Sequence, residues 1–202
     1  MSVDTALTAP REAFRRRLRY PLLLLLLLAA LAVAGLLWRH QAELPAYRGL
    51  LFGGHPAVSP RFETMSSVVD EAALRQHFGA LPWRCEAGRS PDDPSADRIC
   101  RADIGRADGL PAMALTASLR EGRVLGVSVL LPWWAHHAAL RALVSRFGAP
   151  ETIDRTAEPG AAVQWRLPGG WLGLDRRPGF DPLATSRLRW RAEPRPAPPL
   201  PP

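Results

Sequence analysis

The chain has 202 residues, of which 47% are apolar and 22% charged, a composition that fits one folded domain with appended segments. Its formal net charge is +7, and every basic residue is an arginine. No basic cluster alternates with aromatic residues, as base stacking on a nucleic acid would require, so we expect no nucleic-acid binding.

Residues 20–38 form a run of 19 residues without a charge. This length is close to the ~20 residues that cross a bilayer as a helix. Tyr20 and Trp38 stand at its two ends, where aromatic rings favour the membrane interface. We therefore predict a transmembrane helix over residues 20–38, in contact with the lipid bilayer.

The charges on either side of this run indicate its orientation. Five arginines precede the run, whereas only Arg39 follows it immediately. Because the arginine-rich flank stays in the cytoplasm, residues 1–19 are predicted to be a disordered cytoplasmic tail. The chain is then a single-pass protein of the bacterial inner membrane, held by a signal anchor, with its C-terminal domain in the periplasm.

Two other interpretations of the apolar run stay open. An Ala-x-Ala pattern ends at Ala34, so cleavage after Ala34 would make the run a signal peptide. The leucines that continue through Leu37 favour an uncleaved anchor. Arg15 and Arg16 would suit a twin-arginine signal, but Arg19 interrupts what should then be an apolar stretch.

The segment that follows the apolar run is rich in proline and glycine, and the C-terminal segment is rich in proline. Residues 39–61 are predicted to be a linker for this reason. Residues 193–202 contain six prolines and are predicted to be an extended, solvated tail, with a docking peptide as the alternative. Residues 62–192 remain for an extracytoplasmic folded domain.

Two stretches of this domain resemble each other: LRQHFGALP at residues 74–82 and LRALVSRFGAP at residues 140–150. In both, apolar residues recur at the spacing of one face of an amphipathic helix. Gly79 and Gly148 are expected to end the two helices in a left-handed conformation. Residues 67–70 offer a capping box that would open the first helix.

Each predicted helix is followed by up to four short strands with alternating apolar residues, and Glu121-Gly122 is expected to form a hairpin turn. The strands are predicted at residues 82–87, 98–104, 112–120 and 123–131, and at 151–156, 161–167, 169–177 and 186–192. One-sided alternation fits an antiparallel sheet covered on one face by helices. The predicted fold class is α+β, with two helix-plus-antiparallel-β-meander repeats at about residues 66–131 and 136–191.

A resemblance rests on Phe78-Gly79-Ala80-Leu81-Pro82, on Phe147-Gly148-Ala149-Pro150 and on Trp165. A helix ending in Phe-Gly, then a meander bearing a tryptophan, resembles the tandem domains of β-lactamase inhibitor protein. Half of this unit is similar to the small outer-membrane assembly lipoproteins of the SmpA/OmlA kind, although this chain has no cysteine placed for lipidation. The resemblance covers roughly residues 66–191 and implies a binding or assembly role without catalysis.

The chain has two cysteines, Cys85 and Cys100, and both follow the apolar run. Thiols oxidise outside the cytoplasm, and two cysteines allow only one intrachain pairing. If the strands that carry them form a hairpin, the two sulfurs meet across it. We predict a Cys85–Cys100 disulfide, with free thiols as the alternative.

The sequence contains no motif that carries a known chemistry. It has no esterase nucleophile elbow, phosphate loop or dinucleotide fingerprint. His136 and His137 are neighbours on the predicted second helix and point about 100° apart, so they do not chelate one ion as an i, i+4 pair would. We expect both to be at least partly solvated. We predict no catalytic residue, no metal ligand and no cofactor, and hence a protein that is not an enzyme.

Trp133 and Trp134 are adjacent, follow a proline and occupy the junction between the two predicted repeats. Because consecutive residues rarely both bury, we expect one ring to be exposed, and exposed tryptophan is typical of binding hot spots. Trp133 and Trp134 are therefore the predicted partner-binding residues, with a packed connection between the repeats as the alternative.

The function predicted from these features is a non-catalytic, membrane-anchored interaction or assembly factor of the bacterial cell envelope. Its expected partner is another envelope protein. A hydrolase of envelope polymers and an immunity or inhibitor protein are the alternatives.

Overall fold

The computed structural model of the protein describes residues 9–41, 44–66, 69–90, 93–151, 161–175 and 183–193, with side chains from residue 20 onward except at positions 161 and 162. The chain divides into two compact units, Met1–Leu44 and Pro45–Pro202. The predicted proline-rich tail, from residue 194 onward, lies outside the described residues. So does most of the strand predicted at residues 151–156.

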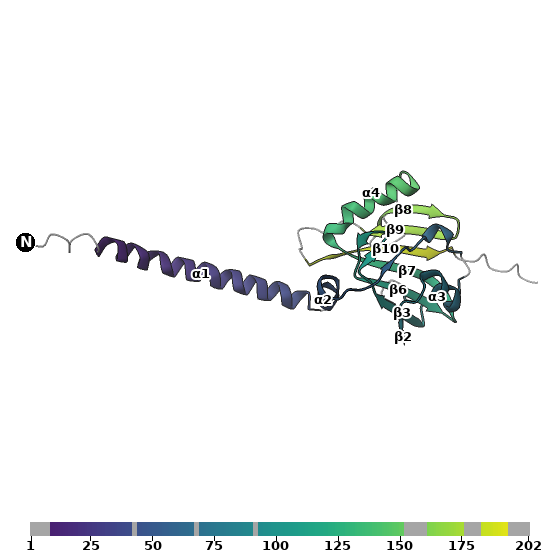
Figure 1. Cartoon of the computed structure of the whole chain (residues 1–202), viewed down its shortest axis with the longest axis horizontal. Coiled ribbons are helices and arrows are strands. Elements are labelled where there is room, and N and C mark those ends of the chain that lie inside the picture. Colours follow the sequence, from purple (N-terminus) through teal and green to yellow (C-terminus); the bar gives the residue numbers. More distant parts are fainter. Residues whose placement is uncertain are drawn as a thin grey trace, which may run out of the picture. The chain divides into compact units, whose positions relative to one another are not determined.

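The first unit is a single long helix, α1 (Ala9–Arg39), followed by a turn (Figure 1). Its Tyr20–Arg39 stretch has a mean hydropathy of 2.6, and none of it is buried inside the protein. The predicted apolar helix is thus present, and its length and composition suit either a membrane anchor or a signal peptide. The helix also includes residues 9–19, which the sequence had assigned to a disordered tail. Alanine, arginine and glutamate in this stretch are strong helix formers.

The stretch predicted as a linker, residues 39–61, contains regular structure. It holds the helix α2 (Leu44–Phe52) and the short strand β1 (Ala57–Val58). β1 pairs in parallel with β4 (Arg106–Ala107), and β4 pairs with β5 (Leu110–Pro111) to complete a small three-stranded sheet. A single 3₁₀ turn, η1 (Phe62–Thr64), follows and buries Phe62. The folded unit therefore begins well before the residue 62 that the sequence suggested.

The main element of the second unit is a seven-stranded antiparallel sheet in the order β2-β3-β6-β7-β10-β9-β8. Figure 1 shows it with its strands labelled. Its strands are β2 (Arg84–Ala87), β3 (Arg98–Asp103), β6 (Ala114–Arg120), β7 (Arg123–Pro132), β8 (Ala161–Leu167), β9 (Gly170–Asp175) and β10 (Thr185–Ala192).

The predicted hairpin turn between β6 and β7 is confirmed. Glu121 has a φ of 51° and Gly122 a φ of 75°. Positive φ at both central residues is the geometry that matches the twist of a two-residue β-hairpin. The turn fixes the register of these central strands and thereby the face on which their side chains lie.

Two helices cover the sheet, α3 (Glu71–Phe78) and α4 (His136–Phe147). The helix α3 begins three residues later than the predicted capping box would place it. Asp70 is its N-cap, with its carboxylate 2.7 Å from the Ala73 amide nitrogen. Gly79 and Gly148 end the helices at φ 70° and 82°, but with ψ near −160° rather than in the left-handed helical region. This extended region with positive φ is open essentially to glycine alone.

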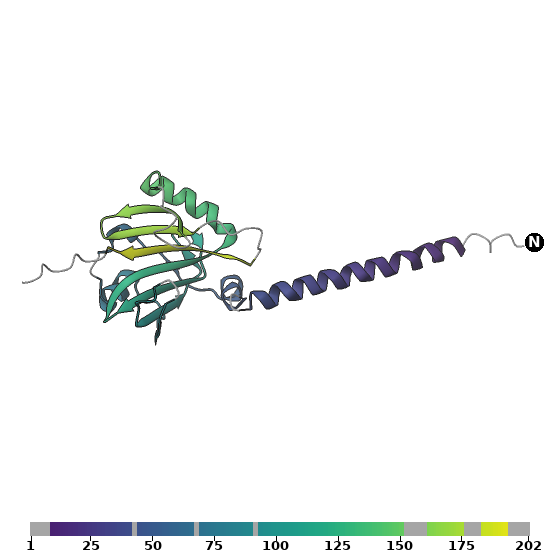
Figure 2. The same cartoon turned by 180° about the vertical axis from the view of Figure 1, so that it is seen from behind.

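The core lies between these helices and one face of the main sheet. Leu74 of α3 and Leu143 of α4 belong to the same buried cluster as the inward side chains of the strands. Figure 1 shows the helices and the sheet from one side, and Figure 2 shows them from behind. The inward residues include Leu115, Ala117 and Leu119 of β6, Leu172 and Leu174 of β9, and Leu188 and Trp190 of β10. The alternation predicted for these strands is therefore confirmed. Both helices of the described residues that pack on the sheet, α3 and α4, contribute to this one core.

Candidate functional site

The predicted partner-binding residues lie where the chain leaves the central strand β7 for the helix α4. Pro132 ends the strand in an extended conformation, and the 3₁₀ turn η2 (Trp133–Ala135) carries the chain into α4. Trp133 is 37% exposed and Trp134 is 44% exposed. Both indole rings reach solvent, whereas the sequence led us to expect one.

Trp133, Trp134 and Tyr47 together form an aromatic cluster. The ring centroids of the two tryptophans are 6.0 Å apart at an interplanar angle of 87°, and Tyr47 of α2 lies 5.8 Å from Trp134. The two tryptophans are arranged edge to face, which is favourable for aromatic rings at this distance, and the ring of Tyr47 is tilted by 40° to that of Trp134. Trp134 is therefore held between two rings while nearly half of its surface stays exposed.

Tyr47 is the buried member of this cluster. Its ring is 6% exposed, and its hydroxyl donates a hydrogen bond of 2.8 Å to the carbonyl oxygen of Ala184. Sequence reasoning missed Tyr47 because it treated the surrounding segment as a linker. The only available signal was an aromatic residue among aliphatic ones in a short apolar stretch, and that signal does not point to Trp134.

His136 differs from its prediction, because it is 5% exposed rather than partly solvated. Its Nδ1 lies 2.9 Å from the Ser186 hydroxyl on β10. These are the residue types of a nucleophile and its base. Ser186 has no exposed surface, however, so no substrate can reach it in this structure. The pair joins α4 to the sheet inside the core, and His137 alone faces solvent.

The predicted disulfide is confirmed: Cys85 on β2 is bonded to Cys100 on β3, and neither cysteine is free. The two residues are direct partners in the antiparallel register. Cys100 is 1% exposed and belongs to the core. The bridge therefore ties the edge strand β2 to the sheet on the face that α3 covers.

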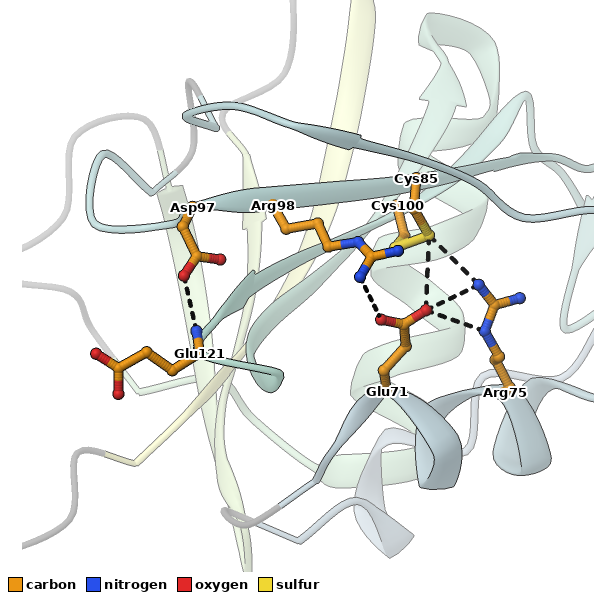
Figure 3. A network of polar contacts seen from close by, with 7 residues as sticks. All are labelled: Glu71, Arg75, Cys85, Asp97, Arg98, Cys100 and Glu121. Carbon is orange, nitrogen blue, oxygen red and sulfur yellow. Dashed lines mark hydrogen bonds and ion pairs between the residues drawn. A yellow bond between two sulfur atoms is a disulfide. The ribbon is translucent and has the colours of Figure 1, made fainter.

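Charged side chains surround this disulfide (Figure 3). Glu71 of α3 accepts contacts from two arginines, with 2.9 Å to Arg75 Nη2 and 3.2 Å to Arg98 Nη1. The same Arg75 nitrogen is 3.5 Å from Cys85 Sγ. All of these charged side chains are partly solvated, so each ion pair stabilises the fold by at most about 1 kcal/mol.

The ligand atoms of Glu71, Cys85 and Cys100 lie within 4.8 Å of one another, which is close enough to surround a metal ion. Both sulfurs are consumed in the disulfide, however, and a disulfide offers no thiolate to a metal. Nearby, Asp97 accepts a hydrogen bond of 2.8 Å from the Glu121 amide, which attaches the β6–β7 turn to the start of β3 (Figure 3). The disulfide and the polar contacts around it therefore stabilise the fold.

Comparison with protein-family models, with curated proteins and with solved structures yields no match. The resemblance carried by the two Phe-Gly motifs therefore stays a prediction. The aromatic cluster is the feature of the described residues whose geometry most clearly suits a function.

Proposed function

We propose that the protein is a membrane-anchored interaction or assembly factor of the bacterial cell envelope that acts by binding another envelope protein, without catalysis. The observation that carries this proposal is the aromatic cluster. Two adjacent tryptophans expose more than a third of their surface each while a third, buried ring fixes one of them in place.

Such an arrangement has the physical properties of a binding hot spot. A tryptophan offers a large apolar area and loses little conformational entropy when it is buried by a partner. The contact of Trp134 with Tyr47 already restricts its ring, so part of the entropic cost of binding has been met during folding. The two tryptophans of the cluster also lie on a short 3₁₀ turn between the central strand and a helix, and not on a long loop.

The proposed location follows from the first unit and the disulfide. An uncleaved α1 would span the inner membrane once, with the arginine-rich N-terminus in the cytoplasm. The bridge between Cys85 and Cys100 is typical of a compartment outside the cytoplasm, which supports a periplasmic second unit.

We also propose that the second unit consists of two helix-plus-meander repeats. The helix α3 precedes β2, β3, β6 and β7, and α4 precedes β8, β9 and β10. The last strands of the two sets, β7 and β10, pair with each other in the middle of the sheet. The similar helix ends at Gly79 and Gly148 also support this plan.

Affinity capture of the full chain from solubilised membranes tests the proposed function. We expect Trp133→Ala and Trp134→Ala each to weaken recovery of one envelope protein by about tenfold or more, as truncation of a hot-spot residue does. Trp171→Ala is the matched control, because this tryptophan of β9 lies near the opposite end of the sheet, level with Gly126 at the start of β7. Unchanged capture by both variants, or equal loss with the control, would contradict the proposal.

A further inference from the structure

The helix α2 has one face packed against the second unit and another face exposed. Tyr47 lies on the packed face, where its buried ring contacts Trp134. Arg48, Leu51 and Phe52 follow at the i, i+3, i+4 spacing of a single helix face, and all three are exposed. These three residues form the outer face of α2.

This outer face is strongly apolar for a surface in contact with water. Leu51 is 66% exposed and Phe52 is 83% exposed. No large apolar side chain of the described residues is more exposed than Phe52. A single exposed apolar residue needs no explanation, whereas adjacent ones beside a charged residue are typical of surfaces that bind a membrane or a protein.

The place of α2 in the chain favours the membrane. The helix α1 ends at Arg39, and α2 begins at Leu44. The Leu44 amide nitrogen lies 3.2 Å from the His40 carbonyl oxygen that accepts its hydrogen bond, which brings the start of α2 close to the residue after α1. Even a fully extended chain from Arg39 to Leu44 would span at most about 18 Å. Because the proposed anchor puts Trp38 at the membrane interface, α2 begins at that interface as well.

The side chains of the outer face also fit a lipid surface. Helices that lie in the membrane interface bury leucine and phenylalanine side chains roughly 5–10 Å into the boundary between headgroups and acyl chains. An arginine on the same turn reaches the lipid phosphates, with which guanidinium groups form charge-assisted hydrogen bonds. A protein partner would not require this face to follow directly on a membrane-spanning helix, so the position of α2 decides for lipid.

We propose that α2 is an interfacial helix whose outer face lies in the periplasmic surface of the inner membrane. Leu51 and Phe52 insert among the upper acyl chains, and Arg48 binds lipid phosphate groups. The proposal rests on the membrane anchor of the proposed function, and it holds the folded unit at the bilayer surface. It uses neither tryptophan of the aromatic cluster, so binding of a protein partner by that cluster is tested separately.

Depth-dependent fluorescence quenching of the full chain in lipid nanodiscs tests this proposal. A solvatochromic amino acid replaces Phe52 in one variant and Glu121 in another. Glu121 is exposed in the β6–β7 turn, and the ten residues of β7 place it about 30 Å from the end of the strand that leads to Trp134. We expect the probe at position 52 to emit at shorter wavelength and to lose most of its emission to a lipid with a nitroxide on the upper acyl chain. The probe at position 121 should show neither effect.

Variants separate insertion from simple proximity to the membrane. With the probe at position 52, Leu51→Asp should abolish both the wavelength shift and the quenching, because an ionised carboxylate resists transfer out of water. Quenching should be stronger in discs that contain phosphatidylglycerol than in discs of phosphatidylcholine alone, and Arg48→Gln should reduce this difference. Arg141→Gln is the matched control, because it removes an exposed arginine from α4 and should leave the quenching unchanged. Circular-dichroism melting curves confirm that each variant is folded.

Three results would overturn the proposal. A probe at position 52 that stays in water, in a chain that has entered the discs, would refute the interfacial helix and leave the membrane anchor standing. If a benzoylphenylalanine at position 52 then attaches to a protein in cells, the outer face binds that protein instead. Equal quenching at positions 52 and 121 would show unspecific contact of the folded unit with lipid. Failure of the full chain to enter the discs would refute the anchor and this proposal together.

Discussion

Cys85 and Cys100 face each other directly across the β2–β3 ladder, with their Cα atoms 4.0 Å apart and their sulfurs bonded. The bridge closes a loop whose ends are 15 residues apart in the sequence. Closing a loop of this length stabilises a fold by roughly 3 kcal/mol, mainly by restricting the unfolded chain.

The first prediction concerns this bridge. Reduction should lower the melting temperature by roughly 6–12 °C, given about 2–4 °C per kcal/mol for a domain of this size. Before reduction, no thiol should react with an alkylating reagent, even in denatured protein. The double variant Cys85→Ser, Cys100→Ser is the control, and its melting temperature should be low and insensitive to reductant. Alkylation of both cysteines in unreduced protein would contradict the bridge.

The second prediction concerns the start of α3. Asp70→Ala removes the carboxylate that accepts from the Ala73 amide, which should cost about 1 kcal/mol and lower the melting temperature by roughly 2–4 °C. Asp70→Asn keeps an oxygen acceptor at the same place and should recover most of this loss. If the asparagine variant melts as low as the alanine variant, the cap does not act through this hydrogen bond.

A third prediction examines how α2 is held. Tyr47→Phe removes the hydrogen bond to Ala184 and should lower the free energy of unfolding by about 1 kcal/mol. Tyr47→Ala also removes a buried ring and should cost roughly 3–5 kcal/mol. Phe52→Ala in the same helix should change the value by less than about 0.5 kcal/mol, because Phe52 is 83% exposed. Urea unfolding measures these free energies. An equal loss of unfolding free energy for Phe52→Ala and Tyr47→Ala would show that the burial of Tyr47 is not what holds α2.

The fourth prediction concerns topology. Alkaline phosphatase fused after Pro202 should be active, because the arginines before α1 hold the N-terminus in the cytoplasm. N-terminal sequencing of the membrane fraction should find the uncleaved chain. An inactive fusion would reverse the orientation, and an N-terminus at Gly35 would show that the apolar run is a signal peptide.

The sequence predicted the main sheet well because its strands carry strong local signals. Leu115, Ala117 and Leu119 alternate strictly, and the turn at Glu121-Gly122 leaves one register for β6 and β7. The disulfide was equally predictable, since two cysteines have a single pairing. In each case the prediction needs only a few neighbouring residues or the number of cysteines in the chain.

The elements that the sequence did not predict depend on contacts between distant segments. The helix α2 has nine residues, fewer than the ~12–15 that an isolated helix needs, so the burial of Tyr47 against the second unit's other elements is what stabilises it. The strands β1, β4 and β5 have two residues each, too few for an alternating pattern. His136 gave no sign of burial, because its partner Ser186 comes from the last strand.

The candidate site also contains residues that local sequence predicts and residues that only distant contacts bring together. Trp133 and Trp134 were recognisable because two adjacent rings cannot both bury easily. Tyr47 was not, because nothing in its local sequence indicates that it lies against Trp134.

The most direct test of the proposed interaction surface is photo-crosslinking in living cells. A benzoylphenylalanine at position 137 would replace the exposed His137 in the first turn of α4, three residues after Trp134, and one at position 120 would stand at the far end of the central strands. The account predicts a covalent adduct with one envelope protein from position 137, lost on Trp134→Ala, and none from position 120. No adduct at position 137, or the same adducts from both positions regardless of Trp134, would contradict it.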